Sequence, residues 1–189
     1  EKKIIKKVFK REYKIQKIDG LEEKKVTPPK EFYERIKREN KWIGQARLID
    51  SDLIFFKKKF IIPVENAIIT GVYGSQRILN GKPKWPHYGL DFAAQEGTKI
   101  KAMLDGVVTL VEVDLFYTGG TLIFDHGHGI STLYMHMEKI LVEKGQKVKQ
   151  GDIIGTVGAT GRATGAHLDV RLNWFDVRLD PATVLDIKK

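Results

Sequence analysis

Residues 106–137 read GVVTLVEVDLFYTGGTLIFDHGHGISTLYMHM. In this stretch, short runs rich in valine, isoleucine, leucine and threonine alternate with glycine-containing turns, which is the pattern of strands joined by tight connections. Runs of the same kind follow one another from Ala67 to Leu172, separated by turns at roughly 8–12-residue spacing. This pattern predicts a mainly β domain, built as a sandwich or barrel.

The first part of the chain has a different texture. Residues 4–18 place apolar side chains at partly alternating positions, which predicts an extended strand or arm. Two prolines at 28 and 29, an acidic residue in the next turn and apolar residues at helical steps predict a helix over about residues 30–49. We therefore expect a basic N-terminal extension of arm and helix over 1–60, followed by the β domain over 61–189.

The net charge of +9 is concentrated in that extension. Residues 1–60 hold 19 basic and 10 acidic side chains, whereas residues 61–189 hold 14 of each. A nucleic-acid-binding domain carries a basic surface on its folded part, so we expect no nucleic-acid partner. The extension is either a solvated charged face or a contact region for an envelope protein or an anionic surface such as a membrane or wall polymer.

Composition excludes several classes of protein. Hydrophobic residues make up 42% and charged residues 30%, as in a globular rather than a disordered chain. The absence of cysteine excludes disulfides, thiol catalysis and zinc ribbons. Apolar runs such as residues 53–56 are too short for a membrane-spanning helix. The chain begins at Glu1 without methionine, so we expect a processed or trimmed product, and a removed signal or anchor is compatible with this.

Histidine and aspartate are paired on two of the expected strands. His87 and Asp91 are four residues apart with Gly89 between them, and His167 and Asp169 are two apart. Residues at i, i+2 and i+4 of a strand share one face, so each pair points to one side. Imidazole and carboxylate groups are zinc ligands, and a catalytic zinc site uses three of them plus an open position.

Of the three other histidines, one is a further candidate for the site and two are expected to be exposed in a turn. His136 lies in LYMHM, where strand alternation places it on the face of Tyr134. His126 and His128 lie in DHGHG, a glycine-rich turn in which histidines are usually exposed to solvent. A single histidine on a strand is most often a packing or surface residue. The joint occurrence of several such groups in one β-rich domain is what favours a site.

These segments carry a family resemblance. The sequence resembles the lysostaphin-type (LytM-like) zinc endopeptidases of bacterial cell walls, and the resemblance covers about residues 61–182. It implies an antiparallel β-sheet groove with a metal ion at its floor. The matching segments are GVYGSQR (71–77), HYGLD (87–91), LYMHM (133–137), VEKGQKVKQGDIIG (142–155) and GATGRATGAHLD (158–169).

The resemblance implies a role for each residue that matches a family motif. His87 and Asp91 match two metal ligands, and His136 and His167 match two catalytic histidines. The family has a terminal H-x-H motif whose second histidine is the third ligand. This chain has H-x-D, so Asp169 occupies the position of that ligand.

The resemblance also implies a substrate and a compartment. Arg77 and Tyr73 flank the groove as substrate-binding residues, and the guanidinium of Arg77 suits a bidentate contact with a substrate carboxylate. The expected function is a zinc-dependent endopeptidase that hydrolyses peptide bonds in peptidoglycan cross-links. The expected location is the bacterial cell envelope, periplasmic or extracellular, with membrane anchoring before processing compatible with it.

Two interpretations of Asp169 remain open at this stage. In the first, its carboxylate binds the metal, and the second anionic ligand makes the ion a weaker Lewis acid or favours another divalent metal such as Mn²⁺. In the second, Asp169 pairs with Arg171 on the same strand face, and the domain is a catalytically degenerate module that binds cell wall or regulates wall hydrolases. Retention of both His136 and His167 favours the first interpretation.

Overall fold

The structure is a computed structural model that describes residues 4, 7, 10 and 12–187. Most of residues 4–11, where the sequence predicts the start of an extended arm, therefore lie outside the described residues. The remainder of that arm contains one short strand, β1 (Ile15–Ile18). Within the described ranges, no helix combines the length and apolar character needed to cross a membrane.

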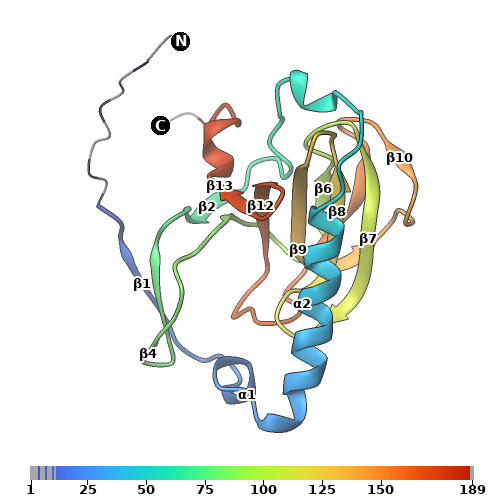
Figure 1. Cartoon of the computed structure of the whole chain (residues 1–189). Coiled ribbons are helices and arrows are strands. Elements are labelled where there is room, and N and C mark those ends of the chain that lie inside the picture. The colour runs from blue at the N-terminus through green and yellow to red at the C-terminus, as the bar shows by residue number, and fades with distance from the viewer. Residues whose placement is uncertain (1–3, 5–6, 8–9, 11, 188–189) are drawn as a thin grey trace.

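The described chain is mainly antiparallel β-sheet, which confirms the predicted fold class (Figure 1). The helices are α1 (Glu23–Val26) and α2 (Tyr33–Arg47), with short 3₁₀ turns at Lys30–Phe32, Phe55–Lys57 and Pro181–Thr183. The remaining strands are β2 (Ile68–Gly71), β3 (Gln76–Leu79), β4 (Lys82–Pro83), β5 (Leu90–Ala93), β6 (Lys99–Lys101), β7 (Gly106–Leu115), β8 (Gly119–Asp125), β9 (Ile130–Ile140), β10 (Lys147–Val148), β11 (Ile153–Val157), β12 (His167–Trp174) and β13 (Val177–Leu179).

One large sheet organises the molecule. Ten strands form it, with the central order β10-β7-β8-β9-β12-β5-β2, and β13 and β11 pair at its sides. A smaller sheet joins β1, β3 and β4, and in it β1 runs parallel to β3. The N-terminal arm is thus hydrogen-bonded to the segment that contains Arg77. The domain boundary near residue 60 stays a prediction.

The two faces of strand β12 have different surroundings. Leu168, Val170 and Leu172 point into the main hydrophobic core, where they pack with residues of β5, β8 and β9. Because side chains alternate along a strand, the residues between them point to the opposite face. That second face carries His167, Asp169, Arg171 and Asn173.

Helix α2 covers part of this second face. Ala46 packs with Leu110, Ile123 and Leu133, which come from β7, β8 and β9. Leu133 is paired with Arg171 of β12, so both side chains lie on the same face of the sheet. The helix that the sequence predicts over 30–49 is confirmed, and it lies against the sheet, where it contacts β7 and β8 (Figure 1).

The turn DHGHG differs from its sequence expectation at one residue. His128 is exposed as expected, but the side chain of His126 is fully buried. One ring nitrogen of His126 is 2.7 Å from the carbonyl oxygen of Asp105, and the other is 2.7 Å from the hydroxyl of Thr132. The bond to Asp105 joins segments 21 positions apart, and the bond to Thr132 joins the turn to the strand after it, so the turn pattern alone does not reveal them.

The burial of His126 predicts a loss of stability in acid. Burial disfavours the imidazolium form and lowers the pKa of His126 from 6.5 to about 4, against smaller raising effects of Asp105 and Asp125. The unfolded chain then takes up a proton below pH 6.5 that the folded chain resists, so stability falls as pH falls from 6.5 towards 4. We expect His126 to contribute a loss of about 2 kcal/mol between pH 7 and pH 4.5.

Urea unfolding at both pH values measures this effect. The pH-dependent loss should be smaller by that amount in His126→Gln and unchanged in the matched variant His128→Gln, whose side chain is exposed. Equal pH dependence in wild type and His126→Gln would contradict the prediction.

Candidate metal centre

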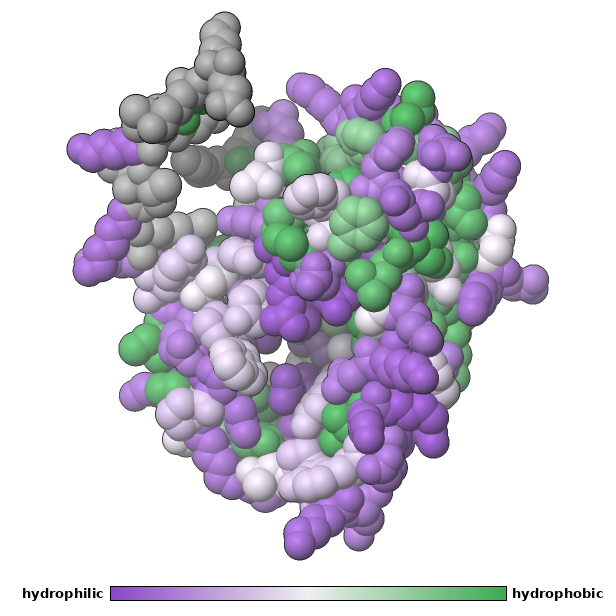
Figure 2. Space-filling view, viewed as in Figure 1, coloured by the Kyte–Doolittle hydropathy of each residue, from purple (hydrophilic) through white to green (hydrophobic). Residues whose placement is uncertain are grey.

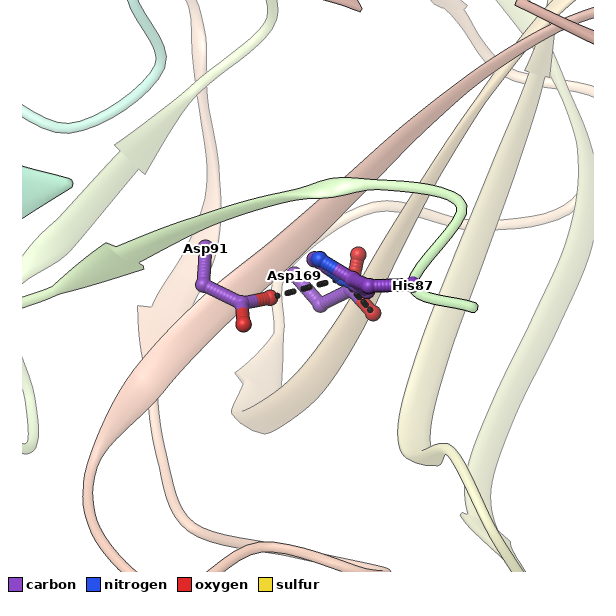
Figure 3. A group of neighbouring side chains, drawn as sticks. All are labelled: His87, Asp91 and Asp169. Carbon is purple, nitrogen blue, oxygen red and sulfur yellow. Dashed lines mark ion pairs between the residues drawn. The ribbon is translucent and has the colours of Figure 1, made fainter. Parts of the chain in front are cut away.

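The three predicted ligands meet at one point of the second sheet face. His87 lies in the segment before β5, Asp91 lies on β5 and Asp169 lies on β12, directly opposite Asp91 in the strand register. One nitrogen or oxygen atom of each residue lies within 4.8 Å of the corresponding atoms of the other two, and all three residues are buried. Figure 3 shows the His87 ring directed towards both carboxylates.

Two glycines make room for the carboxylates. A Cβ atom at Gly89 would overlap a carboxylate oxygen of Asp169, and a Cβ atom at Gly71 would overlap one of Asp91. Gly89 is the residue that the sequence places between His87 and Asp91. The close approach of β5 and β12 at this point therefore requires a residue without a side chain.

The Gly89→Ala substitution tests this requirement. The added methyl group would displace the Asp169 carboxylate, since backbone atoms of Val170 close the other side of the space. Displaced metal-site groups typically reduce metal affinity 10–100-fold, so we expect a loss of about that size. Titration with zinc in competition with a chromophoric chelator measures it. Gly44→Ala is the control for glycine replacement, because no atom lies within 4 Å of a Cβ there and, as at Gly89, the backbone is not left-handed.

The facing atoms of the cluster fit a divalent cation. Nε2 of His87 is 3.1 Å from Oδ1 of Asp91 and 3.3 Å from Oδ2 of Asp169. Ligands of a tetrahedral ion at 2.0–2.1 Å are separated by roughly 3.3 Å. Nε2 of His87, Oδ1 of Asp91 and Oδ1 of Asp169 are buried without a hydrogen-bond partner in the described residues. Buried polar atoms that approach without hydrogen-bond geometry are unsatisfied unless a further group joins them.

Neighbouring charges hold the cluster in its ionised form. Burial alone would raise the pKa of Asp169, but Arg171 and His87 outweigh burial and hold that pKa well below its usual range. Burial and Asp169 act to raise the pKa of Asp91, but His87 and Arg77 lower it. Burial disfavours a charged His87, yet the two carboxylates raise its pKa. A cation that replaced the proton of His87 would meet two ionised carboxylates.

Arg77 and Arg171 each pair with one carboxylate of the cluster. The guanidinium of Arg77 contacts Oδ2 of Asp91, and that of Arg171 lies 3.2 Å from Oδ2 of Asp169. At Asp91 the arginine contacts Oδ2 while Oδ1 faces His87, whereas at Asp169 the same atom, Oδ2, faces both Arg171 and His87, and Oδ1 has no hydrogen-bond partner in the described residues. A role of Arg77 in substrate binding stays a prediction, and its position beside Asp91 adds a role in orienting that carboxylate.

Tyr73 lies at the edge of this region. Its hydroxyl donates a hydrogen bond of 3.1 Å to the carbonyl oxygen of Arg178, and its ring packs edge to face on Tyr88. It does not line either of the two cavities that adjoin the cluster in the described part of the chain. Its expected contact with substrate stays a prediction.

The two remaining histidines lie together beside the cluster. The ring centroids of His136 and His167 are 4.7 Å apart. Nδ1 of His136 is 2.8 Å from the carbonyl oxygen of Thr160, and Nδ1 of His167 is 2.9 Å from that of Gly165. A carbonyl only accepts, so both Nδ1 atoms carry the proton and Nε2 is free on each ring. Burial and His167 lower the pKa of His136 to about 4, so His136 is neutral near pH 7.

The prediction that His136 and Tyr134 lie on the same face of the strand is wrong. Tyr134 points into the main core, and its hydroxyl accepts a hydrogen bond from the backbone of Met103. Between its paired positions at Tyr134 and Met137, β9 has two residues where β8 has one, which is a β-bulge. His136 also has a left-handed backbone with φ of 64°. The bulge interrupts the alternation and turns His136 towards His167.

Three arginines that sequence patterns did not single out adjoin the cluster. Arg47 at the end of α2, Arg162 in the connection before β12 and Arg178 on β13 line the same cavity as His136 and Asp169. They come from positions far apart in the sequence, so no spacing signal groups them. Figure 2 shows a hollow on this face between the α2 side and the β1–β4 side, with many hydrophilic side chains around it.

The chain is similar to several known proteins over this region. The profile described as "Peptidase family M23" matches residues 85–181. The peptidoglycan DD-endopeptidase ShyA of Vibrio cholerae is 46% identical over 87 residues, which are 46% of this chain and 20% of that protein. The chain spans about a fifth of the length of the first curated relatives that it matches.

The chain is also similar to solved structures of peptidases. A zinc containing peptidase from Vibrio cholerae matches with a TM-score of 0.60 and 35% identity, over 65% of this chain and 39% of that one. The catalytic domain of the antimicrobial peptidase lysostaphin from Staphylococcus simulans matches with a TM-score of 0.56 and 30% identity, over 62% of this chain and 91% of that one. The profile covers more than half of the chain and contains both the H-x-x-x-D and H-x-D segments. The lysostaphin-type resemblance seen in the sequence is therefore confirmed, and the chain belongs to peptidase family M23.

Proposed function

We propose that this chain is a zinc-dependent endopeptidase that hydrolyses peptide bonds in peptidoglycan cross-links. The observation that carries the proposal is the cluster of His87, Asp91 and Asp169, each of which has a buried nitrogen or oxygen atom without a hydrogen-bond partner in the described residues, beside the two histidines of the groove. The names of relatives support it, since they include peptidoglycan DD-endopeptidases and a zinc containing peptidase.

His87, Asp91 and Asp169 would hold the metal ion. A bound zinc ion polarises a carbonyl group and makes a water molecule more acidic. Two of these ligands are anionic, so together they cancel the charge of the ion, whereas one carboxylate and two imidazoles leave it at +1. We expect a weaker Lewis acid at this centre, or binding of a harder ion such as Mn²⁺.

His136 and His167 would accept and donate the protons of the reaction. Both present an unprotonated Nε2 atom when their Nδ1 atoms donate to backbone carbonyls. A neutral imidazole accepts a proton from the attacking water, and once protonated it donates to the developing oxyanion or the leaving amine. The backbone carbonyls of Thr160 and Gly165 fix the ring orientations during these transfers.

Peptidoglycan as substrate implies an envelope location, periplasmic or extracellular. The basic residues 1–60 remain a proposed contact region for an envelope protein or an anionic surface. In the folded chain the same region contributes α2 to the groove, because Asn40, Ile43 and Arg47 line the cavity beside His136.

A second candidate function is a non-catalytic module that binds cell wall or regulates wall hydrolases. The observation that favours it is the pairing of both aspartates with guanidinium groups, Asp91 with Arg77 and Asp169 with Arg171. These pairs partly neutralise the carboxylates without a metal ion. Asp169 also stands where the family's H-x-H motif has a histidine.

One experiment separates the two functions. The protein is purified without added zinc, its metal content is measured, and zinc or Mn²⁺ is then titrated into it. The same samples are incubated with purified peptidoglycan, and released peptides are identified by mass spectrometry. Cleavage that disappears with a chelator and returns with metal supports the endopeptidase. A site that micromolar zinc does not fill, in a protein that sediments with peptidoglycan but releases no peptide, supports the binding module.

A further inference from the structure

A cavity with an unusual charge adjoins the metal-ligand cluster. Its volume is about 380 Å³, and His136 and Asp169 form part of its wall. Among the described residues that line it, Asp169 is the one acidic side chain. The basic side chains on the same lining are Arg47, Arg77, Arg162, Arg171 and Arg178. A cavity of this size accommodates a small ligand, and its lining is strongly cationic.

Three of these arginines, Arg47, Arg162 and Arg178, have no carboxylate partner among the described residues, and Arg178 is exposed and lies over the ring of Tyr88. Within the described part of the chain, neither Arg47 nor Arg162 forms an ion pair with an acidic side chain. Arg47 donates one long hydrogen bond of 3.5 Å to the side-chain oxygen of Asn173. Arg162 donates one of 3.4 Å to the carbonyl oxygen of Lys25, and its guanidinium lies over the ring of Tyr117. Both cations therefore keep donors that no protein anion satisfies.

Partial burial makes these unsatisfied arginine donors unfavourable. Nε of Arg47 and Nε of Arg171 are buried without a hydrogen-bond partner among the described residues. Burial, followed by the nearby charges of Arg178 and Arg171, lowers the pKa of Arg47, and burial also lowers the pKa of Arg162. A guanidinium nevertheless stays protonated in proteins. Partly buried cations that neighbouring arginines repel are stabilised by a bound anion.

The chemistry of the lining suits an oxyanion such as a carboxylate. Guanidinium groups donate two parallel hydrogen bonds to a planar carboxylate, and several of them around one cavity bind such a group with orientation. The cavity lies directly beside the metal-ligand cluster, because Asp169 belongs to both. A carboxylate bound here therefore lies close to the bond that the centre would cleave.

We propose that this arginine-lined cavity binds a free carboxylate of the substrate peptide, with Arg47 and Arg162 as its principal ligands. The choice of a peptide carboxylate over another oxyanion rests on the proposed function, whereas the binding of an anion rests on the cationic lining alone. We therefore expect a substrate that has a free carboxylate on a residue next to the scissile bond. The end of α2 becomes part of the substrate-binding site through Arg47.

The probe is N-acetyl-D-alanyl-D-alanine, whose single carboxylate is next to its D,D-peptide bond, and its C-terminal amide is the neutral partner. Isothermal titration gives the affinity of both compounds for the wild-type chain. Hydrogen bonds to charged groups have net values that correspond to about tenfold or more in affinity, so we expect the acid to bind at least about tenfold more tightly. Arg47→Gln and Arg162→Gln should each reduce this preference to about threefold or less.

Lys41→Gln is the matched control. It removes one positive charge from the exposed side of α2 and should leave the preference for the acid unchanged. Circular dichroism checks that each variant is folded, and the comparison of acid with amide in the wild type needs no variant. Inorganic phosphate is titrated as a second anion, and we expect it to compete poorly with the acid.

The experiment distinguishes failure of the carboxylate site from failure of the proposed endopeptidase function. Equal binding of acid and amide by the wild type, or an unchanged preference in both arginine variants, would overturn the carboxylate site. Phosphate that displaces the acid at equal concentration would overturn its assignment to a carboxylate. Peptidoglycan cleavage without any preference for the acid would leave the proposed function standing alone. A preference without cleavage would support the site and contradict the endopeptidase.

Discussion

Replacement of His136 with alanine is expected to lower turnover on peptidoglycan at least about 100-fold, as for the loss of a general acid–base group. Nε2 of His136 has no hydrogen-bond partner in the described residues, its ring lies 4.7 Å from that of His167, and the lowering of its pKa to about 4 leaves the ring unprotonated near pH 7. Metal content should be nearly unchanged, because His136 is not among the three clustered ligands. Initial rates of peptide release and metal analysis of the same sample measure both quantities.

The backbone at His136 calls for a second variant. Its φ of 64° is disfavoured for alanine, whereas asparagine tolerates the left-handed region. His136→Asn should therefore lose the same activity with less effect on folding. His128→Asn is the control, since His128 is exposed and has φ of 49°. Near-normal turnover of His136→Asn would remove His136 from the reaction, and loss of metal from it would place His136 among the ligands.

Replacement of Asp169 with alanine is expected to weaken metal binding at least about 100-fold, the upper end of the loss seen when supporting groups of a metal site are removed. The substitution deletes the carboxylate whose Oδ1 is buried and unpartnered, and leaves His87 and Asp91 as two ligands. Zinc affinity is measured in competition with a chelator, and activity is expected to fall to background.

Arg171→Gln provides the control for Asp169→Ala. It removes the guanidinium that lies 3.2 Å from Oδ2 of Asp169 but keeps the carboxylate. We expect this variant to bind zinc at least as tightly as the wild type, because a competing cation is gone. If Asp169→Ala binds zinc as well as the wild type does, Asp169 is not a ligand, and the binding module becomes the better account of this domain.

The strand pattern predicted the fold class and the composition of the cluster. Alternation has a period of two, so His87 and Asp91 on one segment, and His167 and Asp169 on another, were each expected on one face. The glycine between His87 and Asp91 was recognisable in the sequence, and the structure shows that Asp169 occupies the space it leaves. The helix α2 was predictable because prolines and apolar spacing mark it locally.

Local patterns failed where a contact joins distant segments. His126 looked like a turn residue, and its burial depends on Asp105 and Thr132. His136 left the face of Tyr134 because a bulge in β9 adds a residue that alternation does not foresee.

The sequence by itself determined which side chains could form a metal site, through the co-facial spacing of His167 and Asp169 on one strand and through the family motifs that match His87, Asp91 and Asp169. Only the tertiary structure decided that β5 and β12 are neighbours with Asp91 opposite Asp169, and that α2 brings Arg47 to the same cavity. The physical reason is that strand pairing and helix docking depend on burial of apolar surface across the whole chain, such as Ala46 against Leu133. No short segment contains that information.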